Sequence, residues 1–214
     1  MVQDSSKRLS SRQLSSRQHS PEPLAPARFV ELPALALVGM RQQTSLADNR
    51  MLQLWQQFRP RCKEIPRADL SRFYNLKHFG KGMDWNAFSP QTLFEHWAAV
   101  AVSGDKALIN GTGKAPGYAS HKNPGRESGK GSGTRGLPVG MDTFELESGL
   151  YAVFVYQGLA SGFSDALNAI FGQWLPGTDY QLDDRPHFEV LSEHYRPDDP
   201  NASEEIWVPI APRF

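Results

Sequence analysis

Two stretches of the chain carry apolar residues at the spacing that one face of an α-helix requires. They are Met51, Leu54, Trp55 and Phe58 in the first stretch and Leu167, Ile170, Phe171 and Trp174 in the second. Positions i, i+3, i+4 and i+7 lie on one side of a helix, so each stretch predicts an amphipathic helix with a buried face. Pro60 and Pro176 follow, and each predicts the end of its helix because proline cannot continue the hydrogen-bond ladder.

A strand-like run precedes each predicted helix, and two more follow it. These runs cover 35–42, 72–79 and 94–102 in the first block and 151–158, 186–195 and 204–210 in the second. The first strand and the helix of each block coincide without a gap when residue 35 is laid over residue 151. The pattern predicts an α+β fold of two β-α-β-β units whose strands join in one antiparallel sheet, with a ligand groove between the units.

Two segments show neither the helical period of about 3.6 residues nor the strand period of about two residues. Residues 1–26 are polar and contain LSSRQ twice, which predicts a disordered tail, with a transit peptide as the alternative. Residues 103–140 are rich in glycine and predict a flexible insertion, and their GTGK and ESGKGSG runs do not fit a phosphate-binding loop. We therefore expect a tail and one domain, 27–214, made of repeat one (27–102), the insertion and repeat two (141–214).

Charge and composition narrow the function classes. The 23 basic side chains equal the 23 acidic ones, so the chain as a whole has no footprint for nucleic acid. No apolar run reaches the length of a membrane span, and the lone Cys62 suits a reducing compartment. We expect a cytoplasmic protein that binds neither nucleic acid nor membranes directly. The six histidines lack the spacing of a helical ligand set, so no metal is expected.

Two glutamates stand out in the apolar stretch RPHFEVLSEHY. If residues 186–195 form a strand, Glu189 and Glu193 share one face, and Phe188 and Val190 lie on the other. If Phe188 and Val190 pack on the helices, both carboxylates look into the groove, where a cationic ligand would pair with them. The alternative is that both are solvated or neutralised by nearby basic residues, namely Arg185, Arg196 or Lys77.

Several aromatic residues are candidates for the walls of this groove. They are Tyr151, Tyr156 and Trp207 in the second block and Tyr74, Trp85 and Trp97 in the first. Aromatic rings around a cation add attraction of about 0.5 to 2 kcal/mol for each good contact. Ordinary core packing is the alternative for each of them, and it is favoured for Trp55 and Trp174 because these lie on the helix stripes.

Parts of the chain resemble the GyrI-like domain, which is also the effector-binding half of many AraC-type and MerR-type bacterial regulators. The resemblance is carried by FEHWAAVAV, ESGLYAVFVYQGLAS, IFGQWLPGTDYQLDDRPHFEVLSEHY and EEIWVPI, which cover most of 141–214. It implies two SHS2-like repeats and a groove that binds small hydrophobic, often cationic molecules without a cofactor. It also implies that Glu189, which follows the Phe of the F-E strand, contacts the ligand.

Three functional hypotheses follow. The leading one is a standalone module that binds a hydrophobic, cationic small molecule between the repeats. The second is a hydrolase that uses Glu189 and Glu193 on an electrophilic cyclopropane-type molecule, because some members of the family are similar to such enzymes. The third is a regulator or gyrase-modulating partner that acts by protein contact. Residues 1–30 lack the apolar periodicity of a helix-turn-helix, so direct control of transcription is not expected.

Overall fold

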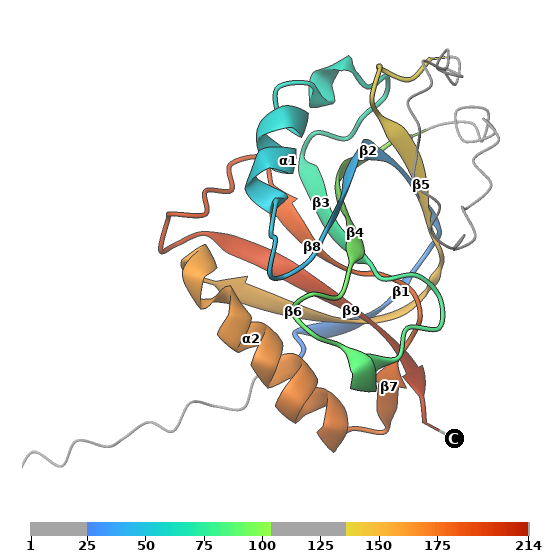
Figure 1. Ribbon diagram of the computed structural model, residues 1–214, viewed down its shortest axis with the longest axis vertical. Helices are drawn as coiled ribbons and strands as arrows, with labels where there is room; N and C mark the ends of the chain where they lie inside the picture. Colours follow the sequence, from blue (N-terminus) through green and yellow to red (C-terminus); the bar gives the residue numbers. More distant parts are fainter. Residues whose placement is uncertain (1–24, 104–135, 214) are drawn as a thin grey trace, which may run out of the picture.

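One curled antiparallel sheet organises the molecule. The computed structural model describes residues 25–103 and 136–213, and in them the sheet forms a half-barrel with two helices on one face (Figure 1). The strand order is β1-β6-β9-β8-β3-β4-β2-β5, with the short β7 beside β9. The predicted α+β fold with a joined antiparallel sheet is therefore confirmed. The predictions for residues 1–26 and most of 103–140 lie outside the described residues.

The sheet is built from two β-α-β-β repeats. Repeat one consists of β2 (Leu35–Thr44), α1 (Met51–Phe58), β3 (Arg72–His78) and β4 (Phe94–Ala101). Repeat two consists of β6 (Gly149–Gln157), α2 (Phe163–Ala169), β8 (His187–Ser192) and β9 (Ser203–Pro212). The repeats meet where β3 pairs with β8, so the central pair of strands holds one strand from each repeat.

The helices follow the predicted apolar stripes, although the second continues past its predicted end at Pro176 in a 3-10 turn, Leu175–Gly177. The helix α1 ends at Phe58, just before Pro60, and buries Leu54 and Phe58. The helix α2 begins at Phe163 and continues through a π-helical turn, Ile170–Trp174, into a last 3-10 turn, so the predicted stripe covers only its later part. No helix within the described ranges is long and apolar enough to cross a membrane.

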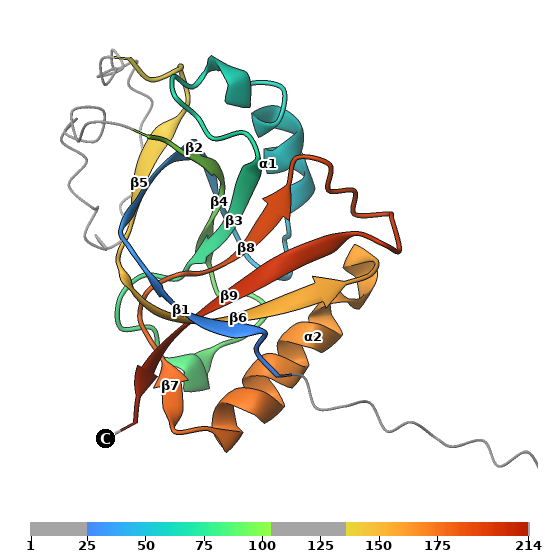
Figure 2. The same cartoon turned by 180° about the vertical axis from the view of Figure 1, so that it is seen from behind.

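Three short strands were not expected from the sequence: β1 (Arg28–Leu32), β5 (Asp142–Leu146) and β7 (Tyr180–Leu182). Although β1 leads into repeat one, it pairs with β6 of repeat two, and β5 correspondingly pairs with β2 of repeat one (Figure 2). Each repeat therefore contributes an edge strand to the other. This exchange holds the two halves together at both ends of the sheet.

Both faces of the sheet carry a buried core. On the face that carries the helices, α1 packs on Val38, Phe73, Val100 and Leu191, and α2 packs on Phe154, Ile206 and Val208. We call this the helix face. The opposite face, which we call the concave face, holds a separate aromatic core that includes Tyr74, Trp97, Tyr151, Phe188 and Trp207. Polar side chains on the helix face therefore need partners within the protein or from a ligand.

Candidate ligand-binding site

Glu189 is a fully buried carboxylate at the junction of the two repeats. It lies on β8, its relative exposure is 0 %, and it faces the helix side of the sheet with Leu191. Asn75 Nδ2 on the neighbouring strand β3 donates a hydrogen bond of 2.6 Å to one carboxylate oxygen. Lys77 Nζ lies 2.6 Å from the other oxygen and forms an ion pair with it. A buried carboxylate is costly unless it is paired and hydrogen-bonded, and here both conditions are met.

Asn75 connects Glu189 to the first helix and to a buried histidine. Its Oδ1 accepts a hydrogen bond of 3.0 Å from Trp55 Nε1 on α1 and lies 2.5 Å from His96 Nε2 on β4. Because an indole N–H can only donate, Oδ1 is the acceptor, and His96 carries its proton on Nε2. The other ring nitrogen, His96 Nδ1, is buried without a hydrogen-bond partner among the described residues. This nitrogen is an acceptor that a ligand or a water could use.

Two histidines beside Lys77 are held neutral. Burial lowers the pKa of His96 to about 3, and the charge of Lys77 adds to the effect. Burial also lowers the pKa of His187 to about 3, again with help from Lys77. The His187 ring stacks on Phe79 at 5.8 Å and meets Phe171 of the second helix edge-on at 5.7 Å. Of these three basic side chains, Lys77 is therefore the one that carries the positive charge beside Glu189.

A second buried carboxyl, Glu204 on β9, lies near Glu189. It is opposite Tyr156 in β6 and opposite Leu191 in β8, and Tyr195 donates a hydrogen bond of 3.3 Å to it. Burial, followed by the nearby charge of Glu189, raises the pKa of Glu204 to about 7. A carboxyl with that pKa can change its protonation state near neutral pH, which suits proton transfer or a change of site charge.

We call the group on the helix face the polar seam, and it consists of Asn75, Lys77, His96, His187, Glu189 and Glu204. Aromatic rings from both helices border it. Phe163 of α2 lies 5.9 Å from Lys77 Nζ and packs edge-on against Tyr156, and Trp55 comes from α1. Carboxylates surrounded by aromatic rings provide both charge and stacking surface for an organic ligand.

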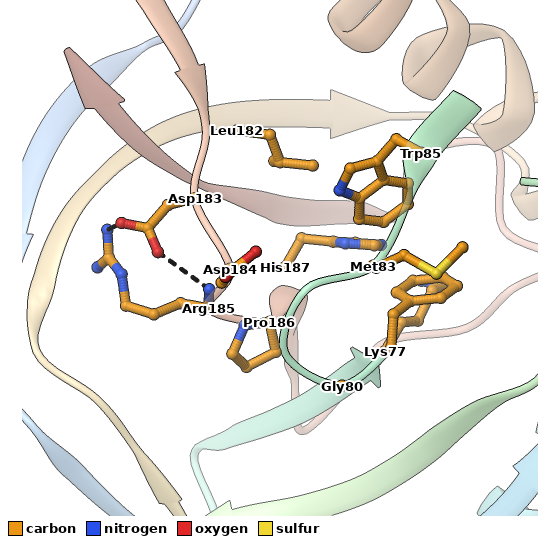
Figure 3. A pocket seen from close by; sticks show the side chains of 11 residues that line it. Lys77, Gly80, Met83, Trp85, Leu182, Asp183, Asp184, Arg185, Pro186 and His187 are labelled. Carbon is orange, nitrogen blue, oxygen red and sulfur yellow. Dashed lines mark hydrogen bonds and ion pairs between the residues drawn. The ribbon is translucent and has the colours of Figure 1, made fainter. Parts of the chain in front are cut away.

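A shallow depression opens beside the polar seam, as Figure 3 shows. Lys77 and His187 contribute to its lining, and Trp85 and Met83 lie across from His187. Its free volume is about 10 Å³, the room that one water needs, and a neighbouring depression holds about 140 Å³. Drug-sized ligands occupy pockets of roughly 300 to 1,000 Å³, so such a ligand requires side chains here to move apart.

Comparison with known proteins identifies the family. Residues 92–211 match the model of the GyrI-like small molecule binding domain, which covers more than half of the chain. The chain belongs to the GyrI-like family. Its sequence is also 26 % identical over 186 residues to the transcriptional regulator BrlR of Pseudomonas aeruginosa. That match covers 86 % of this chain and 55 % of the regulator, so the chain spans about half the length of this curated relative.

Solved structures share the GyrI-like fold at low sequence identity. A putative transcription regulation protein from Staphylococcus aureus MU50 has a TM-score of 0.52 and 16 % identity, covering 86 % of this chain and 96 % of its own. SAV2435 bound to tetraphenylphosphonium has a TM-score of 0.51 and 16 % identity, covering 86 % and 93 %. The C-terminal domain of EcmrR has a TM-score of 0.53 and 11 % identity, covering 86 % and 96 %.

The GyrI-like fold places four predicted wall residues away from Glu189. Tyr74, Trp97, Tyr151 and Trp207 all lie on the concave face, where Trp207 stacks on Phe188 at 5.4 Å. The expectation that they share a groove with Glu189 was wrong, because Phe188 and Val190 pack into the concave core and not against the helices. Alternation had grouped the residues of β8 correctly, but the apolar residues on both faces made the two faces indistinguishable from sequence.

Glu193 does not lie on the same strand as Glu189. The strand β8 ends at Ser192, and Glu193 lies in the following turn, where its half-exposed side chain pairs with His194 at 3.1 Å. The two glutamates therefore do not share a strand face as expected, and their use as a pair in hydrolysis stays a prediction. The second carboxyl near Glu189 is Glu204, which the sequence analysis did not single out.

Two predicted residues do lie on the side of the polar seam. Tyr156 is opposite Glu204 and packs on Phe163, and Trp85 lines the depression of Figure 3. Their contact with a ligand stays a prediction. Four residues of this region were not predicted from the sequence, namely Asn75, His96, His187 and Tyr195, and Lys77 was expected only as a neutralising charge. For β3 a sequence signal was present, because Asn75 and Lys77 share one strand face with Phe73 and alternate with the apolar Tyr74 and Leu76.

Proposed function

We propose that this chain is an effector-binding module that takes up a small hydrophobic molecule with a positive charge at the polar seam, between α1 and α2. The observation that carries the proposal is Glu189, a carboxylate with 0 % exposure at the junction of the repeats. Aromatic residues from both repeats border it. The electrostatic attraction between a cation and a buried carboxylate is stronger than the same attraction in water.

The comparisons support this proposal at the level of the family. The GyrI-like domain is described as a small molecule binding domain, and one structure that shares the fold is that of SAV2435 bound to tetraphenylphosphonium. That molecule combines a delocalised positive charge with four phenyl rings, which matches a carboxylate bordered by aromatic side chains. The relation to a transcriptional regulator supports a role in which the bound molecule acts as an effector, through a partner that contacts this chain.

The test is a calorimetric titration of tetraphenylphosphonium and of its isosteric anion, tetraphenylborate, against the wild-type protein. We expect the cation to bind more tightly than the anion. Glu189→Gln should weaken cation binding at least about tenfold, because a charge-assisted contact contributes about 1.5 to 3 kcal/mol. Glu193→Gln is the matched control, since Glu193 is a half-exposed carboxylate in the next turn, and it should change the affinity less than about twofold.

Two results would contradict the proposal. One is that neither ion binds the folded protein, and the other is that Glu189→Gln and Glu193→Gln have equal effects. Because Glu189→Gln leaves Lys77 without its partner, circular dichroism of each variant must first show that it is folded. The double variant Lys77→Met/Glu189→Gln removes both charges of the pair together and serves where the single variant unfolds.

A further inference from the structure

The carboxylate proposed to hold the ligand already holds a cation from the protein itself. Lys77 Nζ lies 2.6 Å from Glu189 Oε1, and the two side chains are 13 % and 1 % exposed. The same ammonium lies 5.9 Å from the ring centre of Phe163. A carboxylate on one side and an aromatic ring on another are the partners that a ligand cation would use. Lys77 therefore occupies the position that the positive group of a ligand requires.

The other titratable groups of the polar seam do not compete with Lys77 for Glu189. His96 and His187 are neutral because burial lowers the pKa of each to about 3. Among the ion pairs of the described residues, Lys77 is the cationic partner of Glu189. Glu204 lies close enough for its pKa to respond to both Glu189 and Lys77. A cation that arrives from solution must therefore compete with a lysine held at high local concentration by its own backbone.

We propose that Lys77 is a specificity-determining residue of this site: its ammonium is a tethered competitor that must leave Glu189 before a cationic ligand can bind there. The proposal rests on the proposed function and identifies what limits it. In the free protein, Lys77 itself occupies the cation site at Glu189. Binding of a cationic ligand is therefore an exchange of the Lys77 ammonium for the ligand cation. Hydrophobic ligands without charge bind at the aromatic rings and leave the ion pair in place.

The surroundings of Lys77 allow this exchange. The side chain lines the depression of Figure 3 and already touches solvent, and a lysine stem has four rotatable carbons. Asp183 and Asp184 line the same depression, and Asp184 is exposed. A displaced ammonium therefore moves into a space with water and carboxylates, which reduces the loss from breaking its pair with Glu189.

The first experiment compares Lys77→Met with the wild type at about pH 8, above the pKa of about 7 of Glu204. Methionine keeps the apolar stem and removes the charge. We expect tetraphenylphosphonium to bind Lys77→Met at least about tenfold more tightly, while the neutral triphenylphosphine oxide changes less than about threefold. Lys81→Met is the control, because Lys81 is an exposed lysine three residues beyond β3 that pairs with Glu147, and it should leave both affinities unchanged.

Unchanged or weaker cation binding by a folded Lys77→Met would overturn the inference. The result is distinguishable from failure of the proposed function. If the wild type binds the cation through Glu189 and Lys77→Met shows no gain, only the role of Lys77 fails. If the wild type and all variants bind neither probe, the proposed function fails. Lys77→Met/Glu189→Gln should lose the gain, since without the carboxylate there is nothing to compete for.

A second measurement uses the wild-type protein and does not depend on how a variant folds. An amine-directed acetylating reagent is applied with and without tetraphenylphosphonium, and acetylation is quantified by mass spectrometry at Lys77 relative to Lys81. The cation should increase acetylation of Lys77 several-fold, because displacement frees its amine from Glu189. Equal or reduced acetylation in the presence of saturating cation would contradict the exchange, whereas triphenylphosphine oxide should produce no increase.

Discussion

At the scale of residues, Asn75 determines how the polar seam is arranged. One side chain accepts from Trp55, bonds His96 and donates to Glu189, and so links α1, β4 and β8. Asn75 and Glu189 are direct partners in the β3–β8 pairing, one from each repeat. The duplicated fold thus places an amide and a carboxylate side by side at its centre. Because only one of these two partners is charged, the junction carries one negative charge, and Lys77 balances it.

Glu204 provides a test of the electrostatics of the polar seam. Its pKa in the folded protein, about 7, lies above the ordinary 4.5, so its protonated form stabilises the fold below pH 4.5 and that contribution is lost as the pH rises through 7. Glu204→Gln removes this dependence. We expect the stability of the variant relative to the wild type to increase by about 1.4 kcal/mol for each pH unit across that window.

Urea unfolding at about pH 5 and about pH 8 measures this difference, and the contributions of His96 and His187 cancel because both proteins contain them. Glu205→Gln is the control, since Glu205 is the next residue but points to the concave side, where it pairs with Arg28 at 2.6 Å. A relative stability of Glu204→Gln that is equal at both pH values would show that the carboxyl is not perturbed.

At the scale of elements, the exchange of β1 and β5 fixes the edges of the sheet, and Gly149 shows how tightly this is built. Gly149 begins β6 with a φ of +146°, and a Cβ there would lie 2.2 Å from Arg185 Nη1. The Arg185 guanidinium is held by Leu150 O and Asp183 at 3.0 Å, so it cannot easily retreat. Glycine at this position is required by both conformation and space.

Gly149→Ala should lower the free energy of unfolding by about 1 to 3 kcal/mol, from backbone strain together with displacement of Arg185. Gly172→Ala is the matched control, because Gly172 lies in the helical turn after α2 with no atom within 4 Å of a Cβ. That variant should be neutral or more stable by up to about 1 kcal/mol. Equal losses for the two variants in chemical denaturation would contradict the account of Gly149.

The elements predicted from the sequence are those whose apolar pattern repeats over many residues. Both helices and six strands were predicted because their apolar residues repeat over a turn or more of helix or several strand positions. The strands β1, β5 and β7 have 5, 5 and 3 residues and depend on partners distant in the chain, which a local pattern cannot supply. The end of β8 at Ser192 was missed for the same reason, and this placed Glu193 on the wrong element.

At the scale of the whole molecule, the candidate site depends on how two repeats join. Glu189 comes from repeat two, and its partners Asn75 and Lys77 come from repeat one. A family resemblance identified Glu189 from one sequence motif, but the partners follow from the β3–β8 pairing, which is a contact between distant segments. For that reason the carboxylate could be identified from sequence, whereas Lys77 could be named only as one of three basic residues able to neutralise it, and the ion pair confirms that alternative for Glu189.

A structure of the protein with bound tetraphenylphosphonium is the most direct test of this account. We predict that the cation lies on the helix face between α1 and α2, that it contacts Glu189, and that Lys77 Nζ has moved away from the carboxylate. A cation bound on the concave face, among Tyr151 and Trp207, would contradict the account, as would a cation on the helix face that leaves the 2.6 Å ion pair between Lys77 and Glu189 intact.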